Sequence, residues 1–164
     1  MATAIKNPSD FSNVEIPSAA PYRFGIVTAQ WNAGITRPLF EAAYAFLIKY
    51  GALPENILPI AVPGSFELTS GADILLTQHE FDAVICLGCV IQGETKHFDF
   101  ICNAVAGGIT QVSIKHNKPV IFGVLTTDNL QQAKDRAGGV HGNKGEEAAA
   151  SAILMASLQK GDNL

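Results

Sequence analysis

The chain has 164 residues, 48% of them hydrophobic, and a formal net charge of -4. This length is typical of one domain with a substantial core, so we expect a single domain over residues 1–164. The 11 Lys and Arg residues are scattered, whereas nucleic-acid binders gather basic residues on one face, so we expect no nucleic-acid partner. No apolar run reaches the ~20 residues that span a bilayer, and residues 1–21 lack the apolar segment of a secretion signal. We therefore expect a cytoplasmic protein without a membrane partner.

The first predicted strand and helix lie between residues 23 and 51. FGIVTA follows Arg23 and is typical of a buried strand. In TRPLFEAAYAFLIKYG the apolar residues recur every three or four positions, which predicts an amphipathic helix. Thr36 suits its N-cap, Pro38 its first turn and Gly51 its end.

A second strand and helix follow, and then a longer apolar strand. Residues 57–62 form a short apolar strand, and SFELTSGADILLTQ resumes helical spacing. Ser65 is the expected N-cap of that helix, with Glu67 in its first turn. AVICLGCVI, within residues 82–91, is apolar on both alternating faces, which is typical of a central parallel strand covered on both sides.

The remaining chain predicts one more strand and three helices. Residues 97–116 have helical spacing, residues 120–125 form an apolar strand, and residues 129–136 and 146–159 form the last two helices. Alternating strands and helices predict an open parallel sheet with right-handed crossovers. The expected fold class is α/β, a flavodoxin-like three-layer sandwich with a central parallel sheet and helices on both faces. Residues 1–20, rich in Pro, Ser and Asn, are interpreted as a mobile N-terminal arm.

Three cysteines, Cys86, Cys89 and Cys102, raise the question of a disulfide or a metal site. On one strand, positions three apart point to opposite faces and lie ~10 Å apart, whereas a disulfide needs Cα atoms within about 7 Å. We therefore expect buried, reduced thiols that pack as small hydrophobic side chains.

The polar loops of the chain follow the strands. In an open parallel sheet, ligands bind outside the carboxyl ends of the strands. Here these ends lead into residues 30–32, 63–67, 92–97 and 126–129. Residues 92–95, Gln-Gly-Glu-Thr, precede a helix whose free N–H groups and positive dipole end suit an anion such as phosphate.

His97 falls in the first turn of that helix. The partial positive charge there disfavours the imidazolium, so a neutral base would stand beside the anion site. The alternative is that His97 only caps or packs at the start of the helix. The histidines at positions 79, 116 and 141 have no Cys, Asp or Glu at metal-ligand spacing, so we expect no metal site.

Aromatic residues are predicted at the same edge. Trp31 follows the first strand, Phe66 opens the helix after the second, and Phe122 lies in the last strand. Burial in the core is the simpler expectation for each, but three at one polar edge would suit a planar heterocycle. GGVHGNKG lacks the Gly-Lys-Ser/Thr ending of a P-loop and follows no strand, which excludes that nucleotide site.

Five stretches, in order along the chain, resemble the motifs of one enzyme family. They are QWNAGIT, VPGSFEL, GCVIQGETKHFDFIC, PVIFGVLTTDNLQQAKDRAG and GNKGEEAAASAILMA, and they extend from about Arg23 to Leu158. Together they resemble 6,7-dimethyl-8-ribityllumazine synthase, the penultimate enzyme of riboflavin biosynthesis. The resemblance implies a transferase that condenses 5-amino-6-ribitylaminouracil with 3,4-dihydroxy-2-butanone 4-phosphate and releases phosphate and water. It implies no redox cofactor and no metal.

The same resemblance implies a role for each matching residue. His97 would be the acid and base of the reaction. The phosphate would be bound by the backbone N–H groups of Glu94 and Thr95 and by Arg136. The pocket for the uracil, its ribityl chain and the ring system would be formed by Trp31, Ser65, Phe66, Glu67, Cys89, Val90, Ile91, Phe122 and Lys144. Of the residues with an implied role, Phe122, Arg136 and Lys144 would come from a neighbouring subunit.

Two positions differ from many members of the family. Trp31 stands where many have Phe, and Cys89 stands where a hydroxyl or a small apolar residue is common. The larger indole would stack more strongly on an extended ring, so we hypothesise weak riboflavin binding. Two other functions are open on the same fold: a flavin-binding or storage protein without turnover, and a flavodoxin-type electron carrier. The carrier is disfavoured because QWNAGIT stands where a hydroxyl-rich phosphate loop is needed.

The resemblance also implies self-assembly. Head-to-tail contacts would close into a pentamer, and the compact segment AGGVHGNKGE resembles members in which pentamers join into a 60-subunit shell. The N-terminal arm would add a strand to a neighbour's sheet edge. Riboflavin synthase is a further partner that the family suggests.

Overall fold

The computed structural model of the chain describes residues 9–11 and 13–161. Helices and strands alternate as the sequence predicts. In chain order the elements are β1 (Phe24–Ala29), α1 (Ala33–Lys49), the 3-10 turn η1 (Pro54–Asn56), β2 (Ile57–Val62), the 3-10 turn η2 (Ser65–Glu67), α2 (Leu68–Gln78), β3 (Ala83–Ile91), α3 (His97–His116), β4 (Val120–Thr127), α4 (Leu130–Asp135), β5 (Ala137–Gly139), β6 (Gly142–Asn143) and α5 (Lys144–Lys160).

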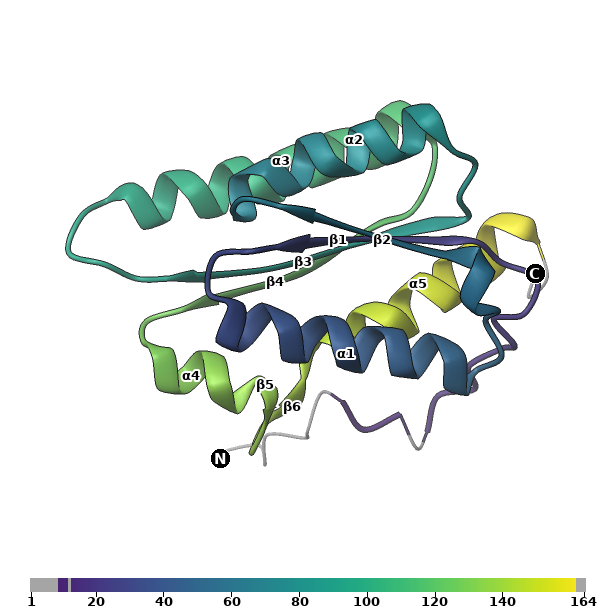
Figure 1. The fold of residues 1–164 in the computed structure, drawn as a ribbon, viewed down its shortest axis with the longest axis horizontal. Helices are drawn as coiled ribbons and strands as arrows, with labels where there is room; N and C mark the ends of the chain where they lie inside the picture. The colour runs from purple at the N-terminus through teal and green to yellow at the C-terminus, as the bar shows by residue number, and fades with distance from the viewer. Residues whose placement is uncertain (1–8, 12, 162–164) are drawn as a thin grey trace.

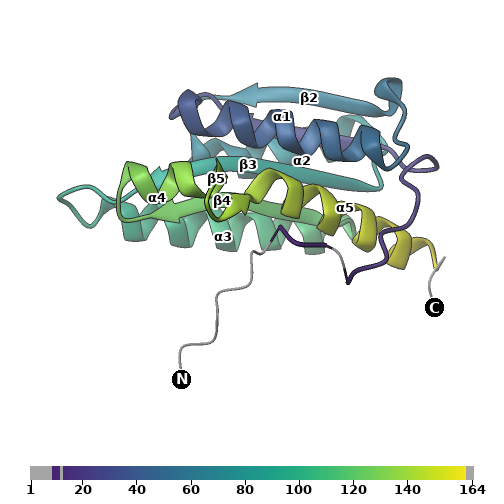
Figure 2. The same cartoon turned by 90° about the horizontal axis from the view of Figure 1, so that it is seen from below.

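The four long strands form one parallel sheet in the order β2-β1-β3-β4. Helices α2 and α3 cover one face of the sheet, and α1, α4 and α5 cover the other (Figures 1 and 2). The first seven residues of β3 are buried, as expected of a central strand covered on both sides. The predicted flavodoxin-like three-layer α/β fold is confirmed.

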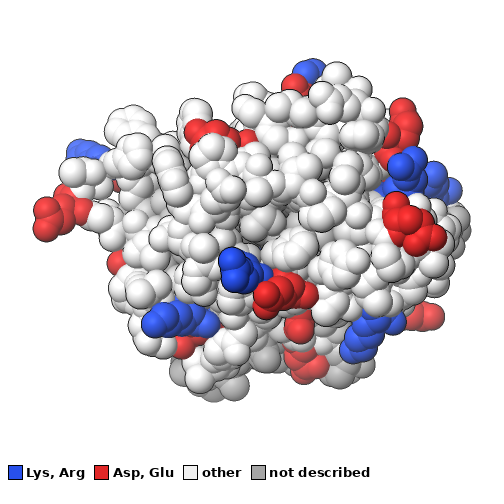
Figure 3. All heavy atoms as spheres, in the orientation of Figure 1, with Lys and Arg blue, Asp and Glu red and all other residues white. Residues whose placement is uncertain are grey.

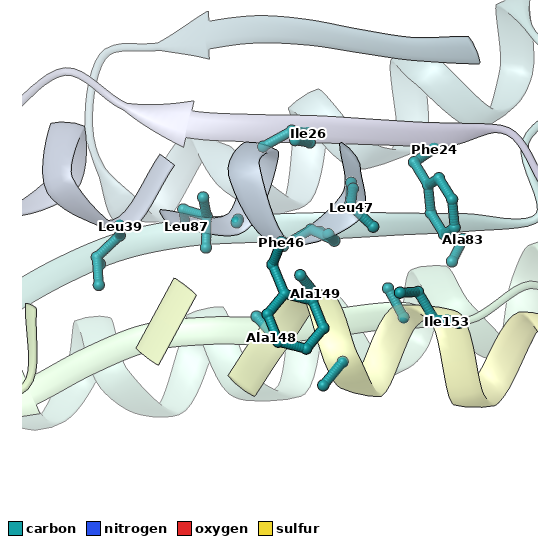
Figure 4. Packing of buried hydrophobic residues seen from close by; sticks show 14 of the residues in the cluster. Phe24, Ile26, Leu39, Phe46, Leu47, Ala83, Leu87, Ala148, Ala149 and Ile153 are labelled. Carbon is teal, nitrogen blue, oxygen red and sulfur yellow. The ribbon is translucent and has the colours of Figure 1, made fainter. Parts of the chain in front are cut away.

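Apolar side chains alternate between the two faces of the sheet. In β1, Phe24 and Ile26 face α1 and α5, while Val27 and Ala29 face α2 and α3. Figure 4 shows the first of these two layers, where Leu87 of β3 joins side chains of both helices. Because β1 and β3 are almost completely buried on both faces, they are held at fixed positions, and the strands paired with them share one carboxyl edge.

Two predicted helix N-caps are wrong, because the residues before each helix adopt a local structure that the sequence pattern does not indicate. Helix α1 begins at Ala33, and its N-cap Asn32 has left-handed backbone angles of φ 60° and ψ 42°. Asn accepts this conformation more readily than most residues, so the helix starts early and Thr36 lies buried inside it instead of capping it. Helix α2 begins after the turn η2, so Ser65 does not cap it.

The segment between α4 and α5 contains a short hairpin that the sequence did not predict. Strands β5 and β6 pair antiparallel, and Gly138 and Gly142 have φ angles of 105° and 78°. Strands of three and two residues are too short to show a periodic pattern. The hairpin leads directly into α5, whose N-cap Asn143 accepts a hydrogen bond from the N–H of Gly145 at 2.8 Å.

The described part of the N-terminal segment contacts its own chain. The rings of Phe11 and Phe46 lie edge to face with centroids 5.4 Å apart. Ala19 is fully buried, and its N–H donates to the carbonyl of Tyr50 at 2.8 Å. Residues 1–8 and 12 lie outside the described residues, so the mobility of the arm and its pairing with a neighbour stay predictions.

Candidate active site

The loops that follow β1, β2 and β3 meet at the carboxyl edge of the sheet. The loop between β3 and α3 extends beyond the rest of the molecule at the left of Figures 1 and 2. The N–H groups of Gln30 and Trp31 donate to the carbonyls of Val62 and Pro63, at 2.8 and 3.0 Å, and so join the first two loops. These bonds continue the register of the sheet beyond the ends of the strands.

The indole of Trp31 lies against the backbone of Gly64. A Cβ added to Gly64 would lie 2.5 Å from Cε3 and 2.7 Å from Cζ3 of the indole, so only glycine fits beneath the ring. The N–H of Gly64 donates to Oε2 of Glu67 at 3.0 Å, which holds the glycine in place. The ring therefore has one supported face, and its other surface is free because 68% of the residue is exposed.

Substituting Gly64 with alanine is expected to displace the indole, because the new methyl group would overlap the ring. Trp31 is the only tryptophan, so the fluorescence emission maximum of the protein should shift. Gly34→Ala is the matched control, since a Cβ there would meet nothing within 4 Å. The same emission spectrum in Gly64→Ala and wild type would show that the ring does not rest on Gly64.

A second aromatic ring at this edge is also exposed. Phe66, in the turn η2 after β2, is 54% exposed. Large apolar side chains in such positions are normally buried, so two exposed aromatic residues on adjacent loops form an apolar surface suited to a planar ligand.

The carbonyl of Cys89, in β3, holds the loops that follow β1 and β2. It accepts a hydrogen bond from Nδ2 of Asn32 at 3.0 Å, and Oγ of Ser65 lies at 3.5 Å from it. Ser65 also packs on Gly88, where an added Cβ would lie 2.6 Å from Oγ. The first two loops are thus fixed to the central strand, and the site is positioned before any ligand arrives.

The three thiols of the chain are free, and burial keeps the two in β3 neutral. Burial raises the pKa of Cys86 to about 12 and that of Cys89 to about 11. Cys102 is also free, and its pKa is raised by burial and by the nearby charge of Asp99. Cys86 and Cys89 are buried and free, as predicted, and point to opposite faces of β3, whereas Cys102 is only partly buried. The Cys89 thiol is therefore neutral and packs as an apolar side chain.

The loop between β3 and α3 presents an open helix N-terminus. Glu94, Thr95 and His97 are all exposed, and α3 runs for 20 residues behind them. The hydroxyl of Thr95 accepts from the N–H of His97 at 3.3 Å. Because α3 is long and its first residues are exposed, this end carries the partial positive charge that favours an anion.

Phe122 does not lie at this edge within one chain. It pairs with Cys86, five residues before β4 ends at Thr127, which at ~3.3 Å per residue is roughly 17 Å from the edge. The expectation that it joins Trp31 and Phe66 is therefore wrong for a single chain. It lies instead on β4, an outermost strand of the sheet.

Arg136 and Lys144 lie together, apart from His97. Nη2 of Arg136 is 2.8 Å from Oε1 of Glu147, and Nζ of Lys144 is 3.3 Å from Oε2 of the same carboxylate. This cluster lies between α4 and α5, on the face of the sheet opposite α3 (Figure 1). One chain thus carries two separated groups of site residues.

Comparison with known proteins identifies the family. A family model described as 6,7-dimethyl-8-ribityllumazine synthase matches residues 21–160. The chain is 61% identical over 155 residues to the 6,7-dimethyl-8-ribityllumazine synthase of Cytophaga hutchinsonii, which covers 94% of this chain and 97% of that protein. The identity is 52% to the corresponding protein of Parabacteroides distasonis (96% and 99% covered) and 50% to that of Porphyromonas gingivalis (98% and 99%).

The chain belongs to the 6,7-dimethyl-8-ribityllumazine synthase family. The resemblance of the five motifs is thereby confirmed, and the chain belongs to a family of transferases. No support appears for a flavin storage protein or an electron carrier.

Of the residues that the lumazine synthase motifs assign to the site, most lie at the carboxyl edge of one chain. They are Trp31, Ser65, Phe66, Glu67, Cys89, Val90, Ile91, Glu94, Thr95 and His97. Phe122, Arg136 and Lys144 lie elsewhere, for the reasons given above. Among residues 9–11 and 13–161, no cluster of three or more His, Cys, Asp or Glu side chains could hold a metal ion.

Sequence reasoning missed three residues that shape the site. Asn32 holds the Cys89 carbonyl, Gly64 supports the indole, and Glu147 pairs with both Arg136 and Lys144. The first two stand beside predicted site residues, so the motifs QWNAGIT and VPGSFEL carried a signal for them. Nothing in the spacing of Glu147 indicated its partners.

The surface carries charges of both signs. Acidic and basic side chains are interspersed on the face shown in Figure 3, as their scattered sequence positions predict. No helix in the described part of the chain is both long and apolar enough to cross a membrane.

Proposed function

We propose that this protein condenses 5-amino-6-ribitylaminouracil with 3,4-dihydroxy-2-butanone 4-phosphate to give 6,7-dimethyl-8-ribityllumazine and phosphate. The match to the family over residues 21–160 carries this proposal. Two exposed aromatic rings beside an open helix N-terminus support it, because the reaction joins a planar heterocycle to a phosphate ester.

The uracil substrate binds between the loops that follow β1, β2 and β3. Trp31 and Phe66 stack on the pyrimidine, and polar groups of Ser65 and Glu67 hold the uracil and its ribityl chain. Cys89, Val90 and Ile91 form the apolar wall of the ring pocket, together with Phe122 from a neighbouring subunit. Lys144 of the same neighbour completes this pocket. The reaction needs no cofactor, because its steps are condensation, elimination and ring closure.

The butanone substrate is held by its phosphate. The N–H groups of Glu94 and Thr95 bind the phosphate at the start of α3, and Arg136 of the neighbour pairs with it through charge-assisted hydrogen bonds. His97, the first residue of α3, transfers protons during imine formation, elimination and ring closure. Holding both substrates in adjacent sites supplies much of the rate, and the anion site stabilises the departing phosphate.

The test of the proposed function is a turnover assay. The purified protein is mixed with both substrates, and the absorbance of the lumazine product is followed together with released phosphate. Equal amounts of lumazine and phosphate are expected. Binding of the uracil substrate without product would refute the proposed catalysis.

Arg136→Ala is expected to raise KM for the butanone substrate by about 10- to 150-fold, since a hydrogen bond to a charged group contributes ~1.5–3 kcal/mol. KM for the uracil substrate should hardly change, because the guanidinium contacts only the phosphate. Steady-state kinetics with each substrate varied in turn measure both values. An increase confined to the uracil substrate would place Arg136 at the wrong end of the pocket.

We also propose that Trp31 gives the protein weak affinity for riboflavin. The indole is supported on Gly64 and exposed on its free side, so a three-ring flavin can stack on it. Titration with riboflavin should quench Trp31 fluorescence to saturation. Trp31→Phe is the control, in which riboflavin fluorescence should show weaker binding. A wild-type protein without saturable quenching would contradict the proposed riboflavin binding.

The proposed assembly is a pentamer, and beyond it a 60-subunit shell. Residues 100–114 of α3 contain no charged side chain, yet Phe100 and Ile114 are 73% and 76% exposed. Such an uncharged exposed face supports burial against other copies of the chain. The N-terminal arm would pair with a neighbour's sheet edge, and riboflavin synthase is the proposed partner of the shell.

The cytoplasm is the proposed location, supported by three free thiols.

A further inference from the structure

The described part of the N-terminal segment, residues 9–11 and 13–22, forms a strap along its own chain. The strap runs from the hairpin β5–β6 to the start of β1, beside α1 and α5 (Figures 1 and 2). Along this path the ring of Phe11 lies edge to face on Phe46 of α1, with centroids 5.4 Å apart, and the N–H of Ala19 donates to the carbonyl of Tyr50 at 2.8 Å. The strap is therefore held on the fold at several points.

Ser9, at the end of the strap beside the hairpin, binds the backbone of Asn143. Oγ of Ser9 accepts from the N–H of Asn143 at 2.9 Å and lies 3.3 Å from the carbonyl oxygen of the same residue. It also lies 3.1 Å from Oε1 of Glu147, so its one proton can be donated to either oxygen. This contact joins the beginning of the chain to the entry of its last helix.

Asn143 is held on its other sides as well. It is only 9% exposed; its Oδ1 accepts from the N–H of Gly145 at 2.8 Å, and its Nδ2 donates to the carbonyl of Pro38, in α1, at 3.3 Å. A buried N–H group needs an acceptor, and Ser9 supplies one from the strap. Asn143 is thus fixed between α1, α5 and the strap.

Lys144 directly follows this fixed point. Its N–H donates to the carbonyl of Arg136 at 2.9 Å, across the base of the hairpin. A displaced Asn143 backbone would displace the Lys144 backbone with it. In the proposed function Lys144 completes the uracil pocket of the neighbouring subunit, and a shift of about 1 Å at such a residue is enough to weaken substrate binding.

We propose that Ser9 is a positioning residue for the site of the neighbouring subunit: the strap fixes Asn143, and Asn143 sets the position of Lys144. This inference rests on the proposed function, in which Lys144 reaches the neighbour's uracil pocket. Ser9 acts through the backbone of its own chain and touches no substrate. The role is distinct from the predicted pairing of the arm with a neighbour's sheet edge, because every contact in it lies within one chain.

Ser9→Ala removes the hydroxyl that accepts the Asn143 N–H. KM for the uracil substrate should rise about 2- to 10-fold, the usual effect of losing one neutral hydrogen bond. The values of kcat and of the butanone KM should stay within about twofold, because the Arg136 guanidinium has partners of its own. A rise in the butanone KM alone would overturn the link to Lys144.

Two further variants accompany Ser9→Ala. Ser9→Thr keeps the hydroxyl and should recover most of the wild-type uracil KM. Ser18→Ala is the matched control, because it removes a hydroxyl from the same strap at a position beside Gly51, just after α1. It should behave as wild type.

The decisive experiment places the substitution in one half of a shared site. When His97→Ala and Arg136→Ala chains are refolded together, intact sites take His97 from the second chain and both Arg136 and Lys144 from the first. Ser9→Ala added to the His97→Ala chain should raise the uracil KM, since that chain supplies Lys144. Ser9→Ala added to the Arg136→Ala chain should leave it unchanged. The assays use a low butanone concentration, at which sites without Arg136 contribute little.

These two mixtures have the same composition and differ only in which chain carries the substitution. Equal rises in both would overturn the positioning role, because they indicate a general structural defect. No rise in either would also overturn it. A rise only when the Arg136→Ala chain carries Ser9→Ala would mean that the strap acts directly on the neighbour, which contradicts the proposal.

Hydrogen–deuterium exchange provides a measurement that does not depend on turnover. In peptides that cover residues 137–147, Ser9→Ala should make the Asn143 amide exchange about 10-fold faster than in wild type, whereas Ser18→Ala should not. A wild type that makes no lumazine would refute the proposed function, and the exchange rates would still decide whether Ser9 fixes Asn143. Unchanged exchange in Ser9→Ala, with an active wild type, would overturn this inference and leave the function intact.

Discussion

His97→Ala is expected to lower kcat by about 10- to 10³-fold, at or below the usual contribution of general acid-base catalysis. The enzyme should keep a measurable rate, because stacking and phosphate binding supply proximity without the imidazole. KM for either substrate should change little. Steady-state assays of lumazine formation measure all three constants.

The structure favours a clean interpretation of this variant. His97 is exposed, and its backbone N–H donates a hydrogen bond to the hydroxyl of Thr95, which alanine would retain. His79→Ala is the matched control, since that residue is also exposed but lies at the end of α2. Wild-type kcat in His97→Ala would mean that His97 only occupies a helix start, which is the alternative that the sequence left open.

The fold could be predicted because its strands and helices carry strong periodic signals. AVICLGCVI is apolar on both alternating faces, and in the structure β3 is buried on both sides. The starts of the helices were less accessible to prediction. Asn32 enters α1 through a left-handed conformation, and a 3-10 turn separates Ser65 from α2. These are single-residue backbone choices that depend on local contacts and not on a repeating pattern.

The site could be predicted only in part, for a related reason. Trp31, Phe66 and His97 lie in or next to the segments that follow β1, β2 and β3, so the parallel topology brings them to one edge. Arg136 and Lys144 flank a hairpin too short to be recognised, and their joint pairing with Glu147 depends on how the hairpin folds back onto α5. The family resemblance identified Arg136 and Lys144, but only the structure shows that the carboxylate of Glu147 lies between them.

Mixing His97→Ala and Arg136→Ala subunits is expected to restore activity above that of either variant alone. The reason is the separation of the two groups: α3 and the hairpin lie on opposite faces of the sheet, so one chain does not bring His97 and Arg136 together (Figure 1). If a site combines His97 of one chain with Arg136 of the next, random mixing of equal amounts makes about one site in four intact. The two variants are unfolded together, refolded, and compared with each variant refolded alone.

The matched control mixes wild type with the double variant His97→Ala/Arg136→Ala. A shared site again predicts about one intact site in four, since each half must come from a wild-type chain. A site within one chain predicts about one in two for this control and none for the mixture of single variants. The two mixtures together therefore distinguish the models by a ratio, which does not depend on the absolute refolding yield. Light scattering on the wild type measures the size of the assembly independently. Equal activities in the two mixtures, on particles of at least pentamer size, are the result that a shared site requires, whereas an inactive mixture of single variants would place the whole site in one chain.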